Sequence, residues 1–107
     1  MWQDDDDRIM DILDIIETEH SVPVVCPICG KREGHFYFHR YEDGKEPGGL
    51  WVWCSACRHS AHSRYRVPEW WKNAEEIRFE KLAALPYYLE EKKHCIDEWI
   101  NRFVLKN

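Results

Sequence analysis

CPIC at residues 26–29 and CSAC at residues 54–57 are two Cys-x-x-Cys pairs, separated by residues 30–53. Each short turn directs two thiolates toward one point, and two such turns complete a tetrahedron with Zn–S bonds of about 2.3 Å. The spacing therefore predicts one zinc ion. Because four thiolates leave no coordination position open, the predicted zinc is structural rather than catalytic. The predicted ligands are Cys26, Cys29, Cys54 and Cys57.

Thioredoxin-like redox chemistry and a pair of disulfides are the alternative interpretations of these cysteines. A redox-active cysteine pair would lie beside a strand–helix–strand pattern, and no such pattern surrounds either pair. Two disulfides would need an oxidising compartment. The chain opens on the acidic residues 4–7 with no basic and apolar leader, so we expect a cytoplasmic protein and favour metal over both alternatives.

Composition favours a packed globule. Hydrophobic residues make up 44% of the 107 residues, and six of them are Trp, which argues against disorder. No apolar run is long enough to span a membrane. We expect a single domain, 1–107, with an N-terminal acidic helix (1–20), a metal-binding part (24–67) and a helical part (68–107). A domain of this size buries only about two thirds of its unfolded surface, so a metal would add to its stability.

Three segments rich in strand-forming residues run through the cysteine-containing part, at 35–41, 50–53 and 60–67. Residues 42–49 are rich in Gly, Pro and charged side chains and are predicted to form a loop. Gly30 and Arg58 each follow the second cysteine of a pair, where such turns often need left-handed backbone. Gly adopts it without strain, whereas Arg must adopt it at some cost or use another turn.

Helices are predicted on both sides of these strands. Residues 4–19 carry isoleucines at helical spacing, and aspartates near the first turn match the helix dipole. Pro68 suits the first position of a second helix ending before Pro86, and a final helix is expected over 86–104. Its apolar stripe comprises Leu89, Ile96, Trp99, Ile100 and Phe103. The expected fold class is α+β, a small antiparallel sheet of about three strands flanked by an N-terminal helix and C-terminal helices.

The segment 24–67 resembles a zinc ribbon. The resemblance lies in the motif Cys26-Pro-x-Cys29-Gly30, in the two strands expected between the cysteine pairs, and in the second pair, Cys54 and Cys57. Zinc ribbons bind DNA, RNA or proteins, so the resemblance alone implies no single function. GGLWVWCSAC at 48–57, followed by VPEWW at 67–71, resembles small bacterial proteins of toxin-immunity loci. That resemblance implies a bacterial protein that binds and neutralises a cognate toxin.

Charge is distributed unevenly and supports two binding hypotheses. Residues 1–20 carry eight acidic side chains and one basic one, whereas 21–66 carry four acidic and seven basic ones. We favour a protein-binding module whose acidic helix meets a basic partner such as a toxin domain. The predicted partner-binding residues are Asp4, Asp5, Asp6, Asp7, Asp11 and Asp14.

The alternative is a nucleic-acid-binding zinc ribbon acting in transcription or its regulation. Basic side chains interleaved with Tyr and Trp offer phosphate contacts and stacking, although a sequence pI of about 5.6 opposes binding to a polyanion. A purely structural explanation is that the aromatic side chains form the hydrophobic core and the basic side chains offset the negative charge of the thiolates. The candidate nucleic-acid-binding residues are Lys31, Arg32, Arg40, Arg58, Arg64 and Arg66.

Catalysis is not expected. The sequence holds no H-E-x-x-H, nucleophile elbow or phosphate-binding glycine loop, so we predict that the chain is not an enzyme and has no small-molecule substrate. Cys95 has no partner cysteine and is predicted to be a small buried hydrophobe. The histidines of the strand region are expected to be surface or capping residues. They are His35, His39, His59 and His62.

Overall fold

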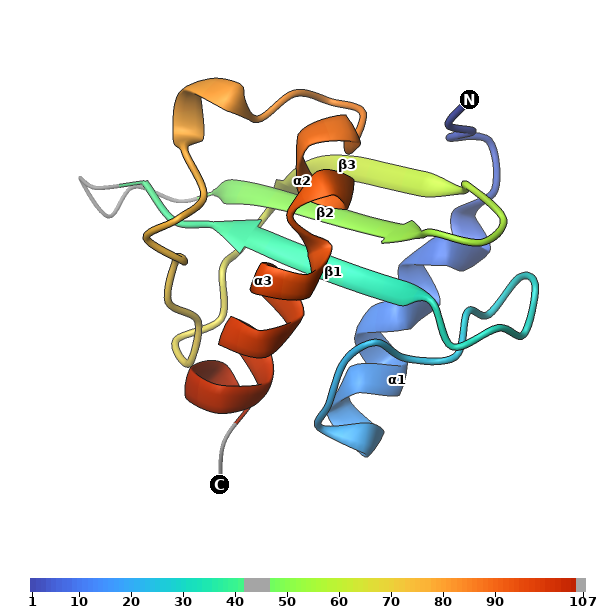
Figure 1. Cartoon of the computed structure of the whole chain (residues 1–107), viewed down its shortest axis with the longest axis horizontal. Coiled ribbons are helices and arrows are strands. Elements are labelled where there is room, and N and C mark those ends of the chain that lie inside the picture. The colour runs from blue at the N-terminus through green and yellow to red at the C-terminus, as the bar shows by residue number, and fades with distance from the viewer. Residues whose placement is uncertain (42–46, 106–107) are drawn as a thin grey trace.

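Three strands form an antiparallel sheet of order β1-β2-β3 in the computed structural model, which describes residues 1–41 and 47–105 (Figure 1). The strands are β1 (Gly34–His39), β2 (Gly48–Cys54) and β3 (Ser60–Tyr65). All three predicted strands are present, within a few residues of their expected bounds. Most of the predicted loop, residues 42–46, lies outside the described residues.

The register of the sheet brings both cysteine pairs to one end. Gly34 at the start of β1 lies opposite Cys54 at the end of β2, and Gly34 also exchanges two backbone hydrogen bonds of 2.9 Å with Val24. The first cysteine turn therefore begins beside the strand end from which the second one emerges. At the other end of the sheet, Gly49 lies between His39 and Arg64.

A helical segment covers one face of the sheet. It begins as a 3-10 turn, η1 (Asp7–Asp11), and continues as α1 (Ile12–Glu19), ending at His20 in the left-handed conformation. The predicted helix 4–19 is correct from residue 7 onward only. Asp6 has extended backbone and instead caps the helix, accepting a hydrogen bond from the backbone N–H of Arg8. The predicted isoleucine stripe is buried at Ile9, Ile12 and Ile16.

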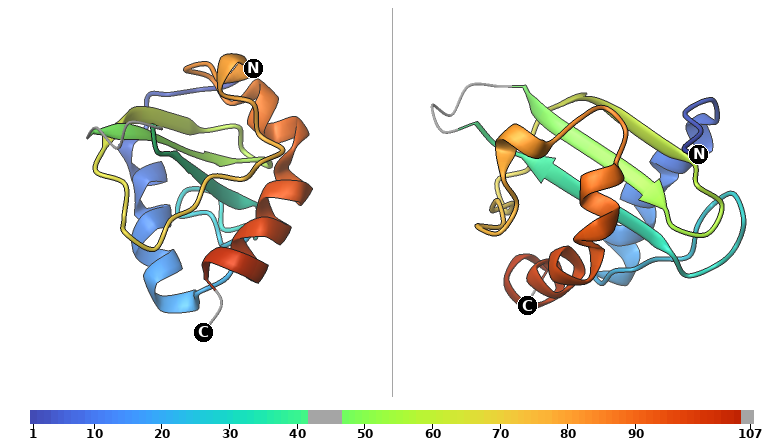
Figure 2. Two further views of the ribbon diagram at one scale, coloured as in Figure 1. Left: turned by 90° about the vertical axis from the view of Figure 1, so that its left-hand side faces the viewer. Right: turned by 45° about the horizontal axis from the view of Figure 1, so that its top comes forward.

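The C-terminal helices cover the opposite face, so the sheet lies between two helical layers (Figure 2). They are α2 (Tyr87–Glu91), α3 (Lys93–Trp99) and a π-helical turn, η3 (Ile100–Val104). The helix expected over 86–104 is thus present, with an interruption at Lys92. Its stripe is buried at Leu89, Ile96 and Ile100, and Phe103 is wrongly predicted because 57% of it is exposed. The fold class is α+β, as expected.

The helix predicted from Pro68 is wrong. Between residues 68 and 86 the only helix is a single 3-10 turn, η2 (Phe79–Lys81). The side chain of Asn73 accepts a hydrogen bond from the backbone N–H of Arg40 and donates one to its carbonyl, continuing the edge of β1. The Tyr37 hydroxyl accepts a hydrogen bond from the backbone N–H of Ala74. These groups bind the sheet, so the segment runs across it as irregular chain.

A buried histidine–aspartate pair joins the two layers. His35 is 2% exposed and stacks on Trp53, and its Nδ1 lies 2.8 Å from Oδ2 of Asp97 on α3. The expectation of a surface or capping histidine is therefore wrong at this position. Nε2 of His35 is also buried and has no hydrogen-bond partner among the described residues.

Asp97→Ala is expected to lower the free energy of unfolding by about 3 kcal/mol, because it leaves a buried imidazole without its partner. Urea unfolding of the metal-loaded protein measures the change. Glu98→Ala on the same helix is the matched control, since Glu98 pairs with Arg102 at the surface and should cost less than about 1 kcal/mol. Equal losses for the two variants would contradict a structural role for the buried pair.

Candidate metal centre

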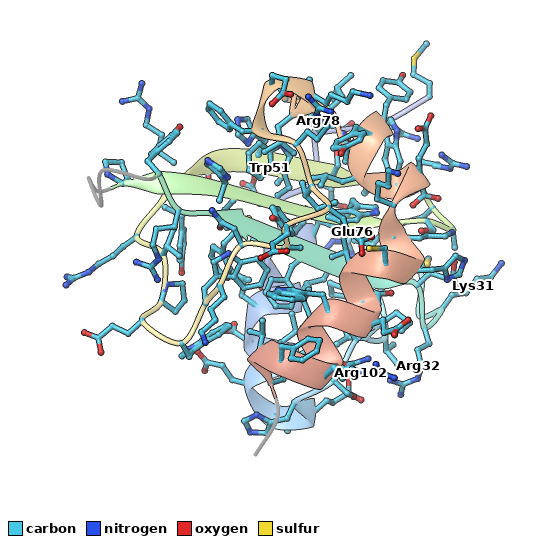
Figure 3. All side chains as sticks on the ribbon, turned by 60° about the vertical axis from the view of Figure 1, so that its left-hand side comes forward. Lys31, Arg32, Trp51, Glu76, Arg78 and Arg102 are labelled. Atoms are coloured by element: carbon cyan, nitrogen blue, oxygen red, sulfur yellow. The ribbon has the colours of Figure 1, made fainter. Side chains whose placement is uncertain are left out.

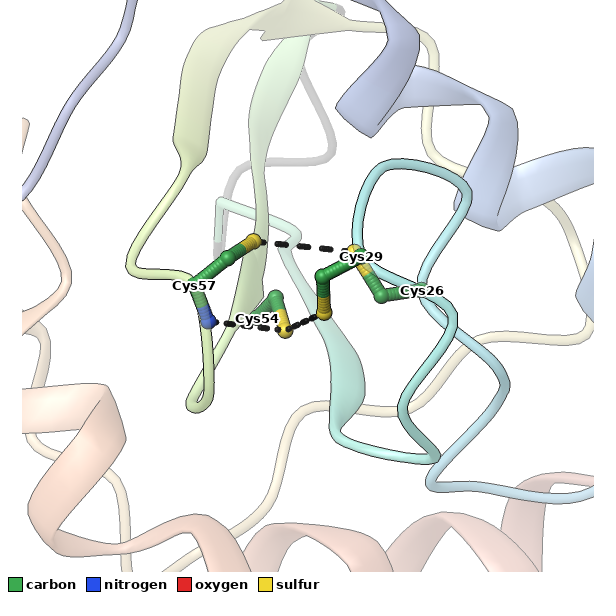
Figure 4. Close-up of side chains that lie close together, drawn as sticks. All are labelled: Cys26, Cys29, Cys54 and Cys57. Carbon is green, nitrogen blue, oxygen red and sulfur yellow. Dashed lines mark hydrogen bonds between the residues drawn. The ribbon is translucent and has the colours of Figure 1, made fainter.

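The four predicted ligands converge at one end of the sheet (Figure 4). Their sulfur atoms all lie within 4.8 Å of one another. The Sγ atoms of Cys26 and Cys57 are 3.7 Å apart, as are those of Cys29 and Cys54. A tetrahedron with metal–sulfur bonds of about 2.3 Å has edges of about 3.8 Å. A disulfide would bring two sulfurs to about 2.05 Å, and all five cysteines are free thiols. The site thus has the size of a tetrathiolate metal centre.

Both cysteine turns have the same backbone pattern. The N–H after each pair, at Gly30 and at Arg58, donates to the carbonyl of the first cysteine at 3.0 Å. Both positions are left-handed, with φ of 80° and 64° respectively. Arg58 therefore adopts the conformation that Gly30 adopts freely, as the sequence required for matching turns. The two turns face each other across the strand ends.

Polar hydrogens point at the sulfurs. The backbone N–H of Ile28 donates to Sγ of Cys26, and that of Ala56 donates to Sγ of Cys54, each at 3.3 Å. Nδ1 of His59 lies 3.3 Å from Sγ of Cys57. Hydrogen bonds of this kind favour thiolates and orient them toward a metal. This contact was not predicted for His59, although the position of His59 two residues after Cys57 was a usable signal.

The environments of the cysteine thiols differ. Burial raises the pKa of Cys54 and of Cys57, while the backbone N–H of Lys31 lowers the pKa of Cys29. A divalent metal must displace protons from the buried thiols, and the fixed N–H donors lower that cost. The chemistry of the donor set fits a soft or borderline metal ion.

The end of the sheet that carries the cysteines is attached to α2 on one side and to the N-terminal arm on the other. A carboxylate oxygen of Glu90 on α2 accepts hydrogen bonds from the Ser55 hydroxyl at 2.6 Å and from the Trp53 indole at 3.1 Å. Burial alone would raise the pKa of Glu90, but these hydrogen bonds and that of Lys93 outweigh it and lower the pKa. On the other side, Gln3 exchanges backbone hydrogen bonds with residues 58 and 60.

The acidic residues predicted to meet a partner fall into two groups. Asp6 pairs with Arg8, and Asp5 lies 3.9 Å from His59, so these two make local contacts. Asp7, Asp11 and Asp14 are exposed, at a spacing that places them on one side of the helical segment. Asp4 is also exposed. No ion pair with a described residue is formed by Asp4 or by the three aspartates of the helical segment, Asp7, Asp11 and Asp14.

The basic residues proposed for nucleic acid do not form one patch. Lys31 and Arg32 project from the first cysteine turn, on the right of Figure 3, and Arg58 lies in the second turn. The remaining three follow or end the strands at the opposite end of the sheet, about 20 Å away by strand length. These are Arg40, Arg64 and Arg66.

Three of these six side chains already have partners within the fold. Arg32 pairs with Glu19 at 3.3 Å, and the guanidinium of Arg58 lies 5.0 Å from the centre of the Trp2 ring. The Arg40 guanidinium donates to the carbonyl of Pro68.

Cys95 is half-buried rather than part of the core. Its thiol donates a hydrogen bond of 2.7 Å to Oε2 of Glu76, and this bond, with burial, raises the pKa of Cys95 to about 11. A thiol that stays protonated is a weak nucleophile, so the contact accounts for a free cysteine at this place. With Trp99 and Phe103, Cys95 lines a hollow of about 450 Å³.

No family model matches this chain, and no curated protein or solved structure is similar enough to it to be matched. Within residues 1–41 and 47–105, no helix combines the length and the apolar character needed to cross a bilayer.

Proposed function

We propose that this chain is a zinc-bound, non-catalytic protein-binding module of the bacterial cytoplasm that binds and neutralises a basic partner protein, such as a cognate toxin. The observation that carries the proposal is a set of exposed aspartates on one side of the first helical segment. Asp7, Asp11 and Asp14 are exposed on one side of it without a cationic partner among the described residues. We call these three residues the acidic face.

Zinc is the metal that best suits the cysteine cluster. Four thiolates at tetrahedral spacing select zinc, iron–sulfur chemistry or copper(I) over magnesium or calcium. Two Cys-x-x-Cys turns with N–H donors to sulfur match the structural zinc sites of ribbons. A closed set of four cysteine ligands leaves zinc without a position for substrate, so its role is to hold the sheet end in place.

Electrostatics supplies the binding mechanism. An acidic surface attracts a basic protein over roughly 8 Å at physiological ionic strength and raises the rate of association. A toxin that acts on nucleic acid carries positive charge at its active site, and an acidic module seated there excludes the polyanionic substrate. The division of the basic residues between two ends of the sheet favours this function over nucleic-acid binding.

The test is capture of the partner by three forms of the protein immobilised at equal density. Wild type is compared with Asp7→Asn/Asp11→Asn/Asp14→Asn and with a control, Glu69→Gln/Glu75→Gln/Glu91→Gln. The control removes equal charge from exposed acids that form no ion pair with a described residue. A basic protein from the native host should bind wild type and control, and associate about tenfold more slowly with the first variant.

Two further measurements are the salt dependence of the association rate and the gel retention of nucleic acid. Association with wild type should slow as salt rises, and the first variant should lose most of that dependence. Equal association rates for all three forms would contradict the acidic face as the binding surface. Gel retention of mixed-sequence RNA or DNA by wild type, reduced by Arg64→Ala/Arg66→Ala, would instead support the nucleic-acid alternative.

A further inference from the structure

The outer edge of β3 carries backbone groups that the fold leaves open. The N–H of Cys54 donates to the carbonyl of His59, so this pair shares ladder hydrogen bonds and the next pair, Trp53 and Ser60, does not. Hydrogen-bonded and non-hydrogen-bonded residue pairs alternate along an antiparallel ladder. The backbone N–H and C=O groups therefore point away from β2 at Ser60, His62 and Arg64. The N–H of Ser60, bonded to Gln3 at 2.8 Å, confirms the direction.

Only the beginning of this edge is covered. Gln3 bridges to His59, and the chain then turns away into η1. Beyond Ser60, the outward N–H groups of His62 and Arg64 donate to no acceptor within residues 1–41 and 47–105. The edge of β1 is different, because Val24 bonds it at one end and Asn73 at the other. The two edges lie on opposite sides of the sheet (Figure 1).

A hollow of about 350 Å³ runs beside the open edge. Asp4, Asp7 and Met10 line it from the N-terminal layer, and Ala84 and Leu85 line it from the segment before α2. Its floor is formed by residues 60–63 of β3. The hollow therefore combines open backbone groups, apolar side chains and two carboxylates that form no ion pair within the described part of the chain.

We propose that the open edge of β3 binds an extended, basic segment of the partner protein by strand addition. This inference rests on the proposed function and names the surface that the partner would use. Outward N–H and C=O groups at alternate residues recognise an extended backbone rather than a helix. Successive side chains of an added strand point to opposite faces, so basic ones meet Asp4 and Asp7 while apolar ones meet Leu85.

Charge decides between a partner segment and a second copy of this chain. Pairing of two β3 edges would bring together two N-terminal arms, each with four aspartates at residues 4–7 followed by one arginine. Like charges at such a contact oppose association. A segment rich in lysine or arginine brings the opposite charge to the same place.

The probe is a synthetic peptide of alternating Lys and Val, eight residues long and capped at both ends, added to the full metal-loaded chain. NMR of the labelled protein should show shifts at the amides of His62 and Arg64, and slower exchange of both with solvent. Asp4→Asn/Asp7→Asn should weaken binding about tenfold, and a Glu-Val peptide should not bind. Absence of shifts at millimolar Lys-Val peptide would overturn the proposal.

Backbone recognition is tested by His62→Pro against His62→Ala. Proline removes the outward N–H without touching the ladder to β2, whereas alanine keeps the N–H and removes the same ring. Only the proline variant should lose binding, by about tenfold. A Lys-Val peptide methylated at every backbone nitrogen should fail to bind wild type, which tests the same hydrogen bonds if the proline variant does not fold. Equal binding of the methylated peptide would overturn strand addition.

Two further outcomes separate this inference from the proposed function. A captured partner that depends on the acidic face but binds His62→Pro and His62→Ala equally would leave the proposed function standing and overturn strand addition. Concentration-dependent dimerisation of wild type that His62→Pro abolishes would show that a second copy, not a partner, occupies the edge. Sedimentation of the metal-loaded protein without peptide measures that outcome.

Discussion

Removing the metal should unfold the protein. Structural zinc bound by cysteines contributes about 10–16 kcal/mol of apparent binding free energy, which is comparable to the whole stability of a small domain. Chelator treatment is therefore expected to abolish the near-ultraviolet circular dichroism of the buried Trp and Tyr side chains. Metal content measured on the same sample should fall from one equivalent to none. Restoring zinc should restore the signal.

Cys54→Ser tests the same dependence within the chain. Cys54 is the last residue of β2 and is fully buried, so its thiolate would connect a bound metal directly to the central strand. The variant should lose metal and fold poorly, and Cys95→Ser should keep both metal and stability because its thiol lies outside the cluster. A chain that keeps its dispersed amide spectrum after complete metal removal would contradict a structural role for the metal.

Trp71→Ala should be the most damaging substitution outside the cysteines. Trp71 is 2% exposed, and its ring centre lies 5.1 Å from that of Tyr37, 5.4 Å from Phe38 and 5.7 Å from Phe36. Truncating a buried Trp costs about 3–5 kcal/mol through lost contacts and the cavity left behind. Urea unfolding with saturating zinc should show a loss of about 4 kcal/mol.

The neighbouring tryptophan provides the control for this substitution. Trp70 is 47% exposed, and its ring makes edge contacts with Phe38 and Trp71 only at 6.1 Å and 6.5 Å. Trp70→Ala should therefore cost about 1 kcal/mol or less. Metal content should stay at one equivalent in both variants, which separates loss of packing from loss of the metal. Similar losses at the two positions would contradict the assignment of Trp71 to the core.

Short-range patterns predicted the parts of this protein that depend on short-range geometry. Two thiolates three residues apart must lie on one turn, so the cysteine cluster followed from spacing alone. Alternating and helical periodicity likewise predicted the three strands and the final helix, because the side-chain period is a property of the backbone. At Arg58 the sequence left two possibilities, the left-handed backbone of Gly30 or another turn, and the structure has the first.

Contacts between distant residues decided the rest. The helix expected from Pro68 is absent because Asn73 bonds the edge of a strand 33 residues away, a competing partner that no local pattern contains. His35 is buried because Asp97, 62 residues away, supplies its hydrogen bond. The acids of the N-terminal arm, uniform in the sequence, differ because Arg8 and His59 reach only two of them.

Residue spacing was thus sufficient for the cysteine cluster, for the three strands and for the first and last helices, since these are set by neighbouring residues along the chain. Pairing of the strands, the open edge of β3 and the separation of the basic residues appeared only in three dimensions. These features depend on which long-range hydrogen bonds and contacts prevail when segments compete for the same surface. Local sequence does not contain the outcome of that competition.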